Sequence, residues 1–308
     1  MTIRREDSSF RKAHPVMTND QAPSSAPSSA LDALRQRIDS IDAELHRLLM
    51  ERVRVIDGIV AAKRASGADT VMFRPDREAD MMRRLVERHS GTLPLTTVEH
   101  IWREIITSCT RLQGDFAVHL DGGADVADMR DLARYYFGFS VEMESPGDAA
   151  DVVGTVAASH SDLGIISLAE RAEVPWWRGL GVDGAQIIAR LPFFVAHDRP
   201  ADLDAVVISR PVPDAGTPDT AVFDARWNGI LPGNLMSSGL EVLSFFRTAE
   251  GVDALLAASG DLSEGDVLAL CAAAGAEPDV IRFVGGYASP IDIETDLDSD
   301  EEFGTEAE

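Results

Sequence analysis

Two basic side chains at helical spacing are the first residues in the sequence whose types could do chemistry together. Apolar residues recur from Leu31 in alternating steps of three and four, and the next step beyond Leu48 falls on Arg52. Lys63 follows eleven residues later, which returns to within about 20° of Arg52 around the helix and about 16 Å along its axis. Because a buried cation without a counter-charge costs several kcal/mol, we expect acidic side chains or an anionic ligand between them.

A carboxylate and an amide are expected to face the same interior from two further helices. Glu78 precedes the apolar residues Met82 and Leu85 by four and seven, and Gln113 extends an apolar stripe that contains Cys109. These charged and polar groups could simply neutralise one another as a buried network. Two cations, one carboxylate and one amide on three helices instead favour a site for an anionic ligand.

The rarity of lysine and the position of Arg35 bear further on this hypothesis. The chain contains 26 arginines but only two lysines, Lys12 and Lys63. A codon bias toward arginine explains this, or position 63 needs a compact ammonium that a planar guanidinium cannot replace. Arg35 lies seventeen residues before Arg52, about 25 Å along the helix, too far to contact the same small ligand from one chain. Either it is an exposed arginine near a helix start, or a second, antiparallel copy of the helix brings it to the ligand.

The distribution of charge separates the chain into different parts. The net charge of −24 comes from residues 115–308, which carry −26, whereas residues 1–29 and 30–114 carry +1 each. This excess of acid disfavours binding of nucleic acid or an anionic membrane surface. No apolar run is long enough for a membrane span and the first thirty residues lack a secretory pattern, so we expect a cytoplasmic protein with free thiols at Cys109 and Cys271 and no metal site.

Three helices would position the site. The first runs for roughly 35 residues from Leu31, about 50 Å, which is too long for a monomeric domain of this size and calls for a partner helix. The second starts near Pro75, which fits a first helical turn. A capping box of Thr96 and Glu99 predicts the start of the third, and Gly114 its end.

The remainder alternates strand-like and helical patterns, with tails at both ends of the chain. We expect disordered tails at 1–29 and, because it is strongly acidic, at 291–308. Residues 211–220 read as a link. The predicted strands are 116–120, 164–167, 187–194, 205–209, 242–246 and 280–285, and the predicted helices are 129–137, 149–158 and 264–274.

Residues 30–114 resemble the all-helical class of chorismate mutase. The resemblance rests on the spacing of four motifs across 85 residues: 34–39 (LRQRID), 48–52 (LLMER) with Lys63, 74–79 (RPDREA) and 102–109 (WREIITSC). It implies an α+β multidomain protein whose N-terminal three-helix domain forms an intertwined all-α dimer. The implied reaction is the Claisen rearrangement of chorismate to prephenate in aromatic amino-acid biosynthesis, with no metal or cofactor.

The resemblance also implies a role for each matching residue. Arg35 of the neighbouring subunit and Arg52 would bind the two carboxylates of chorismate. Lys63 and Gln113 would donate hydrogen bonds to its ether oxygen, where negative charge develops as the C–O bond breaks. Glu78 would accept a hydrogen bond from the ring hydroxyl.

Three further residues are implied at the edge of this site. Arg77 would support it. Cys109 and Arg74 stand where some members have a serine and an aspartate, so their substrate contacts differ from those of such members. We expect residues 30–114 to stay folded and active without residues 116–308.

Residues 115–290 resemble a prephenate dehydratase lobe (115–210) and an ACT regulatory unit (221–290). The similar stretches are 161–166 (SDLGII) and 281–287 (IRFVGGY), but the catalytic signatures of a dehydratase are missing. We therefore expect a mutase fused to a divergent α/β domain with an ACT-like end, which could bind an aromatic amino acid. The alternatives are a bifunctional mutase and dehydratase, and a helical dimerisation module without catalysis.

Overall fold

The computed structural model of the protein describes residues 26–66, 73–213 and 215–294. The predicted tails therefore lie largely outside the described residues. The chain divides into two units at Val55, so that the first helix contributes to both. Among the described residues, no helix is both long and apolar enough to cross a membrane.

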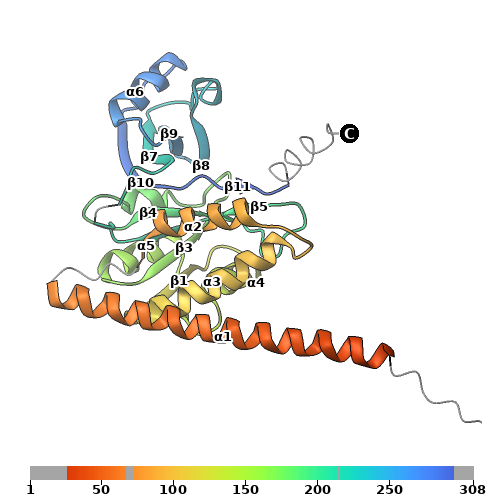
Figure 1. Cartoon of the computed structure of the whole chain (residues 1–308). Coiled ribbons are helices and arrows are strands. Elements are labelled where there is room, and N and C mark those ends of the chain that lie inside the picture. The colour runs from red at the N-terminus through yellow and green to blue at the C-terminus, as the bar shows by residue number, and fades with distance from the viewer. Residues whose placement is uncertain (1–25, 67–72, 214, 295–308) are drawn as a thin grey trace, which may run out of the picture. The chain divides into compact units, whose positions relative to one another are not determined.

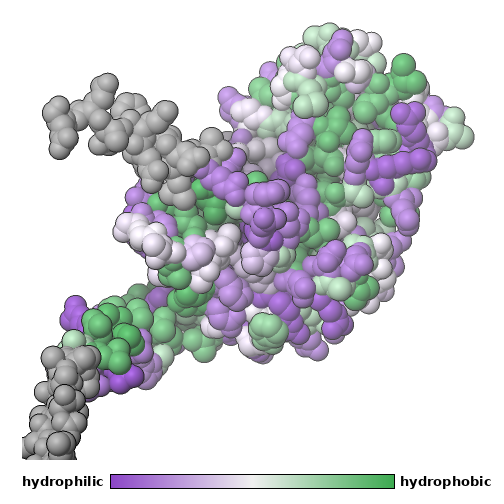
Figure 2. Space-filling view, turned by 90° about the vertical axis from the view of Figure 1, so that its right-hand side faces the viewer, coloured by the Kyte–Doolittle hydropathy of each residue, from purple (hydrophilic) through white to green (hydrophobic). Residues whose placement is uncertain are grey.

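The first unit is formed by the larger part of helix α1 (Ala26–Ser66), which confirms the predicted long helix (Figure 1). It begins at Ala26, inside the predicted tail, with Pro27 in its first turn, where proline fits without a lost hydrogen bond. The predicted apolar stripe is exposed: from Leu31 to Leu48 its members are 47–63% accessible. Figure 2 shows this hydrophobic surface on the N-terminal part of α1.

Helices α2 (Pro75–Arg88) and α3 (Leu95–Arg111) follow α1, whose residues 56–66 begin the second unit. Helix α2 starts at Pro75 as predicted. The predicted capping box is wrong, because Pro94 occupies the N-cap of α3 and no side chain caps this helix. Thr96 lies inside α3 and Glu99 is fully buried, where other partners hold its carboxylate.

A nine-stranded mixed sheet forms the centre of this unit, in the order β2-β1-β3-β6-β4-β10-β7-β9-β8. Three helices contact strands of this sheet (Figure 1): α4 (Val126–Phe137), α5 (Ala149–Ala158) and α6 (Glu264–Ala273). The strands are β1 (Ala117–Asp121), β2 (Glu142–Gly147), β3 (Leu163–Ser167), β4 (Gln186–Leu191), β6 (Ala205–Ser209), β7 (Thr220–Trp227), β8 (Glu241–Arg247), β9 (Val252–Ser259) and β10 (Val280–Tyr287).

The sheet runs without interruption through the two regions predicted as separate lobes. Strands β4 and β10 pair in parallel at Ile187 and Gly285. Gly285 has φ = 132°, and a Cβ at this position would lie 2.3 Å from the carbonyl oxygen of Ile187, so only glycine permits the approach. The predicted strand 187–194 is split into β4 and β5 (Phe194–Val195), and β5 pairs with β11 (Ile291–Asp292), inside the predicted acidic tail.

The apolar stripes of α2 and α3 belong to the core of this sheet. Met82, Leu85 and Val98 are buried in one cluster with residues of β1, such as Val118, and of β6, such as Val207. The helical segment therefore shares its hydrophobic core with the α/β part. This argues against the expectation that residues 30–114 fold without the rest.

Candidate functional site

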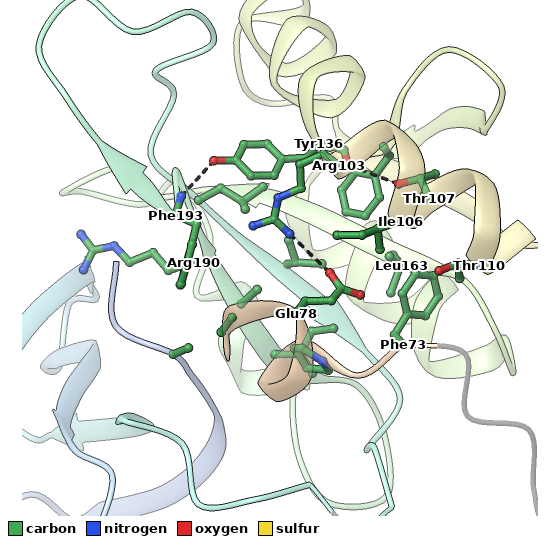
Figure 3. Close-up of a pocket in the computed structure, with 18 residues that line it drawn as sticks. Phe73, Glu78, Arg103, Ile106, Thr107, Thr110, Tyr136, Leu163, Arg190 and Phe193 are labelled. Atoms are coloured by element: carbon green, nitrogen blue, oxygen red, sulfur yellow. Dashed lines mark hydrogen bonds and ion pairs between the residues drawn. The ribbon is translucent and has the colours of Figure 1, made fainter. Parts of the chain in front are cut away.

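A pocket lies between helices α2 and α3, the end of α4 and strands β3, β4 and β6 (Figure 3). Most of its lining is apolar, including Phe73, Ile106, Leu163 and Phe193. Its polar lining residues are Glu78, Arg103, Thr107, Thr110, Tyr136 and Arg190. An apolar pocket with a few convergent polar groups is the usual form of a small-molecule site.

Glu78 and Arg103 meet across this pocket. The Nη1 of Arg103 donates to the Oε2 of Glu78 over 3.3 Å, as Figure 3 shows. Burial raises the pKa of the Glu78 carboxyl, an effect that the Arg103 guanidinium opposes and Asp76 increases. The Arg103 guanidinium also lies 5.0 Å from the ring centre of Tyr136 and 5.9 Å from that of Phe193.

A second ion pair lies behind Arg103 and is wholly buried. The Nη2 of Arg199 lies 3.4 Å from the Oε2 of Glu99, and both side chains have no accessible surface. The other carboxylate oxygen of Glu99 is 3.8 Å from the Nη2 of Arg103. Burial raises the pKa of the Tyr135 and Tyr136 hydroxyls, and the nearby Glu99 carboxylate raises both further, so both hydroxyls stay protonated.

The hydroxyls of these tyrosines connect the ion pair to the backbone. Tyr135 donates to the carbonyl oxygen of Thr96 over 2.6 Å and its hydroxyl lies 3.2 Å from the Oε2 of Glu99. The Tyr136 hydroxyl accepts from the backbone N–H of Phe193 over 2.9 Å and from Arg199 over 3.2 Å. Helix α3 is thereby tied to α4 and to the segment that follows β5.

The opposite end of the pocket is closed by Arg190 of β4. Its guanidinium donates to Asp204 over 3.0 and 3.2 Å and to Glu241 over 3.1 Å. Arg190 is therefore already neutralised by two carboxylates. The nearest acidic partner of Arg103 is Glu78, and its buried Nε has no hydrogen-bond partner among the described residues. Of the two arginines that line the pocket, Arg103 therefore has more unfilled hydrogen-bonding capacity.

Residues 34–114 match the family model for chorismate mutase type II. This helical part of the chain is thus similar to chorismate mutase type II. Two relatives are each named "Bifunctional chorismate mutase/prephenate dehydratase". The protein of Stutzerimonas stutzeri is 30% identical over 146 residues, which cover 46% of this chain and 40% of the relative. That of Pseudomonas aeruginosa is 31% identical over 152 residues, which cover 48% and 41%.

Two further comparisons cover other lengths of the chain. A bifunctional chorismate mutase/prephenate dehydratase of Neisseria gonorrhoeae is 37% identical over 79 residues, 26% of this chain. The chain thus spans less than half of the length of these relatives. A solved chain of GqqA, described as a novel type of quorum quenching acylases, covers 56% of this chain at a TM-score of 0.38 and 12% identity.

The structure assigns the predicted cations of the mutase segment to helix α1. Arg35 and Arg52 lie in the first unit, where Arg35 forms an exposed ion pair with Asp32 over 3.1 Å and Arg52 is half-buried. Lys63 lies in the last turns of α1, and its side chain is outside the described ones. Glu78 belongs to the second unit, so neither unit holds the whole predicted set by itself.

The other predicted residues of the mutase segment surround α2 and the end of α3. Arg74 is the half-buried N-cap residue of α2, with its Nε 3.9 Å from Asp76, and Arg77 is exposed. Cys109 is buried, and Gln113, just beyond α3, donates to the Cys109 carbonyl oxygen over 3.4 Å. Among the described residues that line the pocket, Glu78 alone belongs to the predicted set.

The residues that surround Glu78 were not among the predicted site residues. Arg103 and Glu99 stand four apart on one face of α3, a spacing that could have paired them. Arg199 and Tyr136 could not be found in this way, because only the fold brings them to α3. Arg103 was part of a motif used for the resemblance, but no role was predicted for it.

The edge of the sheet at the end of β1 is acidic. Asp121 ends β1, and burial raises the pKa of its carboxyl; hydrogen bonds from the backbone of Gly123 and Ser167 lower that pKa, and the negative charges of Asp148 and Glu173 raise it. The Asp121 carboxylate accepts from the backbone N–H of Gly123 over 2.9 Å. A cluster of three carboxylates is a poor environment for a dianionic substrate.

Proposed function

We propose that the protein is a chorismate mutase, which rearranges chorismate to prephenate within one molecule. The observation that carries the proposal is the match of residues 34–114 to the chorismate mutase type II family. It is supported by the near-neutral charge of this segment within a strongly acidic chain, which suits a dianionic substrate. The proposed site residues are Arg35, Arg52, Lys63, Arg74, Arg77, Glu78, Cys109 and Gln113.

The proposed reaction needs electrostatic stabilisation and orientation, and no nucleophile. Arg35 and Arg52 would hold the two carboxylates in the compact conformer that reacts. Lys63 and Gln113 would stabilise the negative charge that develops on the ether oxygen, and the carboxylate of Glu78 would accept the ring hydroxyl. Each of these tasks requires a charge or a hydrogen bond, and none of them requires a proton to be transferred during the reaction.

The proposed catalytic unit is a homodimer. Arg35 and Arg52 lie on one continuous helix, seventeen residues apart, so they cannot contact one small molecule from the same chain. The exposed apolar stripe of α1 supports pairing with a second copy, since a row of leucine and isoleucine side chains at helical spacing is suited to a partner helix. The second copy would then supply Arg35 to the site.

One experiment tests the proposed activity directly. Purified full-length protein is incubated with chorismate, and the loss of chorismate and the formation of prephenate are measured against an uncatalysed control. We expect prephenate as the product. Absence of any rate above the control, in protein that is folded and dimeric, would leave only the alternative of a helical dimerisation module.

The same incubation decides a second candidate function. The two relatives that align over about half of this chain are named as bifunctional enzymes, which favours a dehydratase activity. The acidic edge at Asp121 opposes it. We propose that the α/β part does not form phenylpyruvate from prephenate, and detection of phenylpyruvate would establish the bifunctional alternative.

The proposed organisation keeps the boundaries expected from the sequence. The helical segment 30–114 is followed by the dehydratase-like lobe 115–210 and the ACT-like unit 221–290. We propose a cytoplasmic enzyme, with an aromatic amino acid as an effector of the ACT-like unit. Titration of the protein with such amino acids, read out as a change in mutase rate, tests the effector.

A further inference from the structure

We propose that Arg103 is a positioning residue of the mutase, which holds the Glu78 carboxylate ionised and in place, and that the α/β part of the chain in turn holds Arg103. This inference rests on the proposed function for its catalytic consequence. Its structural content, the control of Glu78 by Arg103, can be measured without substrate.

Four side chains of alternating charge form a continuous row through the interior. The row runs from Arg199, after β5, to Glu99 and Arg103 on α3, and ends at Glu78 on α2. Successive charged atoms are 3.4, 3.8 and 3.3 Å apart. The row is buried at Arg199 and Glu99, and accessible surface increases toward Arg103 (11%) and Glu78 (27%).

The position of Arg103 is fixed from several sides. Glu99 attracts it from the preceding turn of α3, and the rings of Tyr136 and Phe193 lie within 6 Å of its guanidinium. Tyr136 is itself fixed, because its hydroxyl binds Arg199 and the backbone of Phe193. A guanidinium held in this way has little freedom, so a carboxylate that pairs with it is positioned in turn.

The charge of Glu78 depends on this partner. Burial favours the neutral carboxyl, and the neighbouring carboxylate of Asp76 on α2 acts in the same direction. The other charged group lining the pocket is Arg190 of β4, which Asp204 and Glu241 already neutralise. Arg103 of α3 is therefore the cation that keeps Glu78 able to accept a hydrogen bond as a carboxylate.

The α/β part thus contributes to the mutase site through residues far away in the sequence. In the part of the chain that the structure describes, no hydrogen bond or ion pair joins Tyr136, Phe193 or Arg199 to Glu78, yet they hold the side chain that holds Glu78. This gives the acidic remainder of the chain a role that needs no catalytic activity of its own.

A matched control exists on the same helix. Arg83 of α2 forms an ion pair with Asp219 of the α/β part and a second one with Asp80 over 3.1 Å. Arg83 lies five residues beyond Glu78 and outside the pocket of Figure 3. Arg83→Gln therefore removes a bridge between α2 and the α/β part without touching Glu78.

The experiment compares Arg103→Gln, Arg103→Lys and Arg83→Gln in the full chain. The pKa of Glu78 is measured by carbon NMR of labelled glutamate, with Glu78→Gln to assign the signal, and kcat/KM for chorismate is measured across pH. We expect Arg103→Gln to raise the pKa of Glu78, move the acidic limb of kcat/KM to higher pH and lower kcat/KM at neutral pH by about 10- to 100-fold. Arg103→Lys should shift both in the same direction but less, because an ammonium cannot contact Glu78 and Glu99 together.

Arg83→Gln should leave the pKa of Glu78 unchanged and kcat/KM within about twofold of the unsubstituted protein. The inference is overturned if the pKa of Glu78 is the same in both Arg103 variants as in the unsubstituted protein, or if Arg83→Gln shifts it equally. If Arg103→Gln does not fold, Arg103→Lys decides by the same criteria. A chain in which Arg103 controls Glu78 but which has no mutase activity would refute the proposed function and leave the charge control standing.

Discussion

The charged environment of Glu78 is formed by residues of both the helical segment and the α/β part of the protein. The motif of Glu78 belongs to the mutase segment, while its environment is made by Arg103 and, behind Arg103, by the buried Glu99 and Arg199. A carboxylate in such a pocket is costly unless its counter-charge is fixed. The charge state of this one group should therefore be visible in the pH dependence of the proposed reaction.

The first prediction concerns this pH dependence. Burial raises the pKa of Glu78, so as pH falls its side chain is protonated at a higher pH than an ordinary glutamate. Once protonated, it no longer accepts a hydrogen bond from the ring hydroxyl as a carboxylate. We expect kcat/KM to fall as pH falls through this raised pKa. Glu78→Gln should have a lower kcat/KM at neutral pH and should lack this acidic limb; an identical limb in Glu78→Gln would assign it to another group.

The second prediction concerns Lys63. Removing one donor to a developing oxyanion typically costs about 2–4 kcal/mol of transition-state stabilisation, and we expect this loss in kcat/KM for Lys63→Ala. Lys63→Arg should not restore the rate, because a planar guanidinium cannot replace a compact ammonium there. The control is Arg47→Ala, which removes an exposed cation paired with Glu44 and Glu51 on the same helix and should keep normal kinetics.

At the scale of elements, α1 is unusual because its apolar residues remain accessible along most of its length. The side chains from Leu31 to Leu48 repeat on one face, and Glu44, Arg47 and Glu51 form ion pairs elsewhere on the helix. A continuous exposed apolar stripe favours association. The proposed occupant of this stripe is α1 of a second copy.

The third prediction tests this pairing. Leu45→Asp places a charge in the centre of the stripe and should convert a dimer to a monomer, as measured by light scattering on a sizing column. The monomer should also lose mutase activity, because Arg35 of the second copy is then missing. Ala43→Asp, on the opposite face by helical spacing, should keep both the mass and the rate; a dimer that survives Leu45→Asp would place the interface elsewhere.

The sequence predicted elements well where one local signal dominates. Pro75 marked the start of α2, and the spacing of Met82 and Leu85 identified its buried face. The capping box failed because Glu99 meets local criteria for a cap while its carboxylate is held by Arg199, 100 residues away. The strands β2, β7 and β9 were not predicted individually, since their places in the sheet depend on neighbours that no local pattern reveals.

At the scale of the whole molecule, the helical segment and the α/β part form one hydrophobic core. Met82 and Leu85 of α2 and Val98 of α3 are buried with residues of β1, α4 and β6. Each such side chain contributes about 1.5–3 kcal/mol when it is withdrawn from water. The family to which residues 34–114 match could be predicted from motifs, but this shared core could not, because it is a property of the assembled fold.

The fourth prediction follows from the shared core. A fragment of residues 30–114 should expose the apolar faces of α2 and α3 and should not give a cooperative thermal transition by circular dichroism. The control fragment 26–294 retains the described core and should melt like the full chain. A folded, dimeric and active fragment 30–114 would instead support the independent mutase module that the sequence alone suggests.

The shared core also determines when the helical segment can complete its folding during translation. Helices α2 and α3 leave the ribosome before the strands that cover their apolar faces, and Val207 of β6 emerges last among the partners discussed above. Until then, the newly made segment has its signature residues but no completed interior. The helical segment must therefore wait for most of the second unit before its interior is complete, so translation yields a folded helical segment only together with the acidic α/β part.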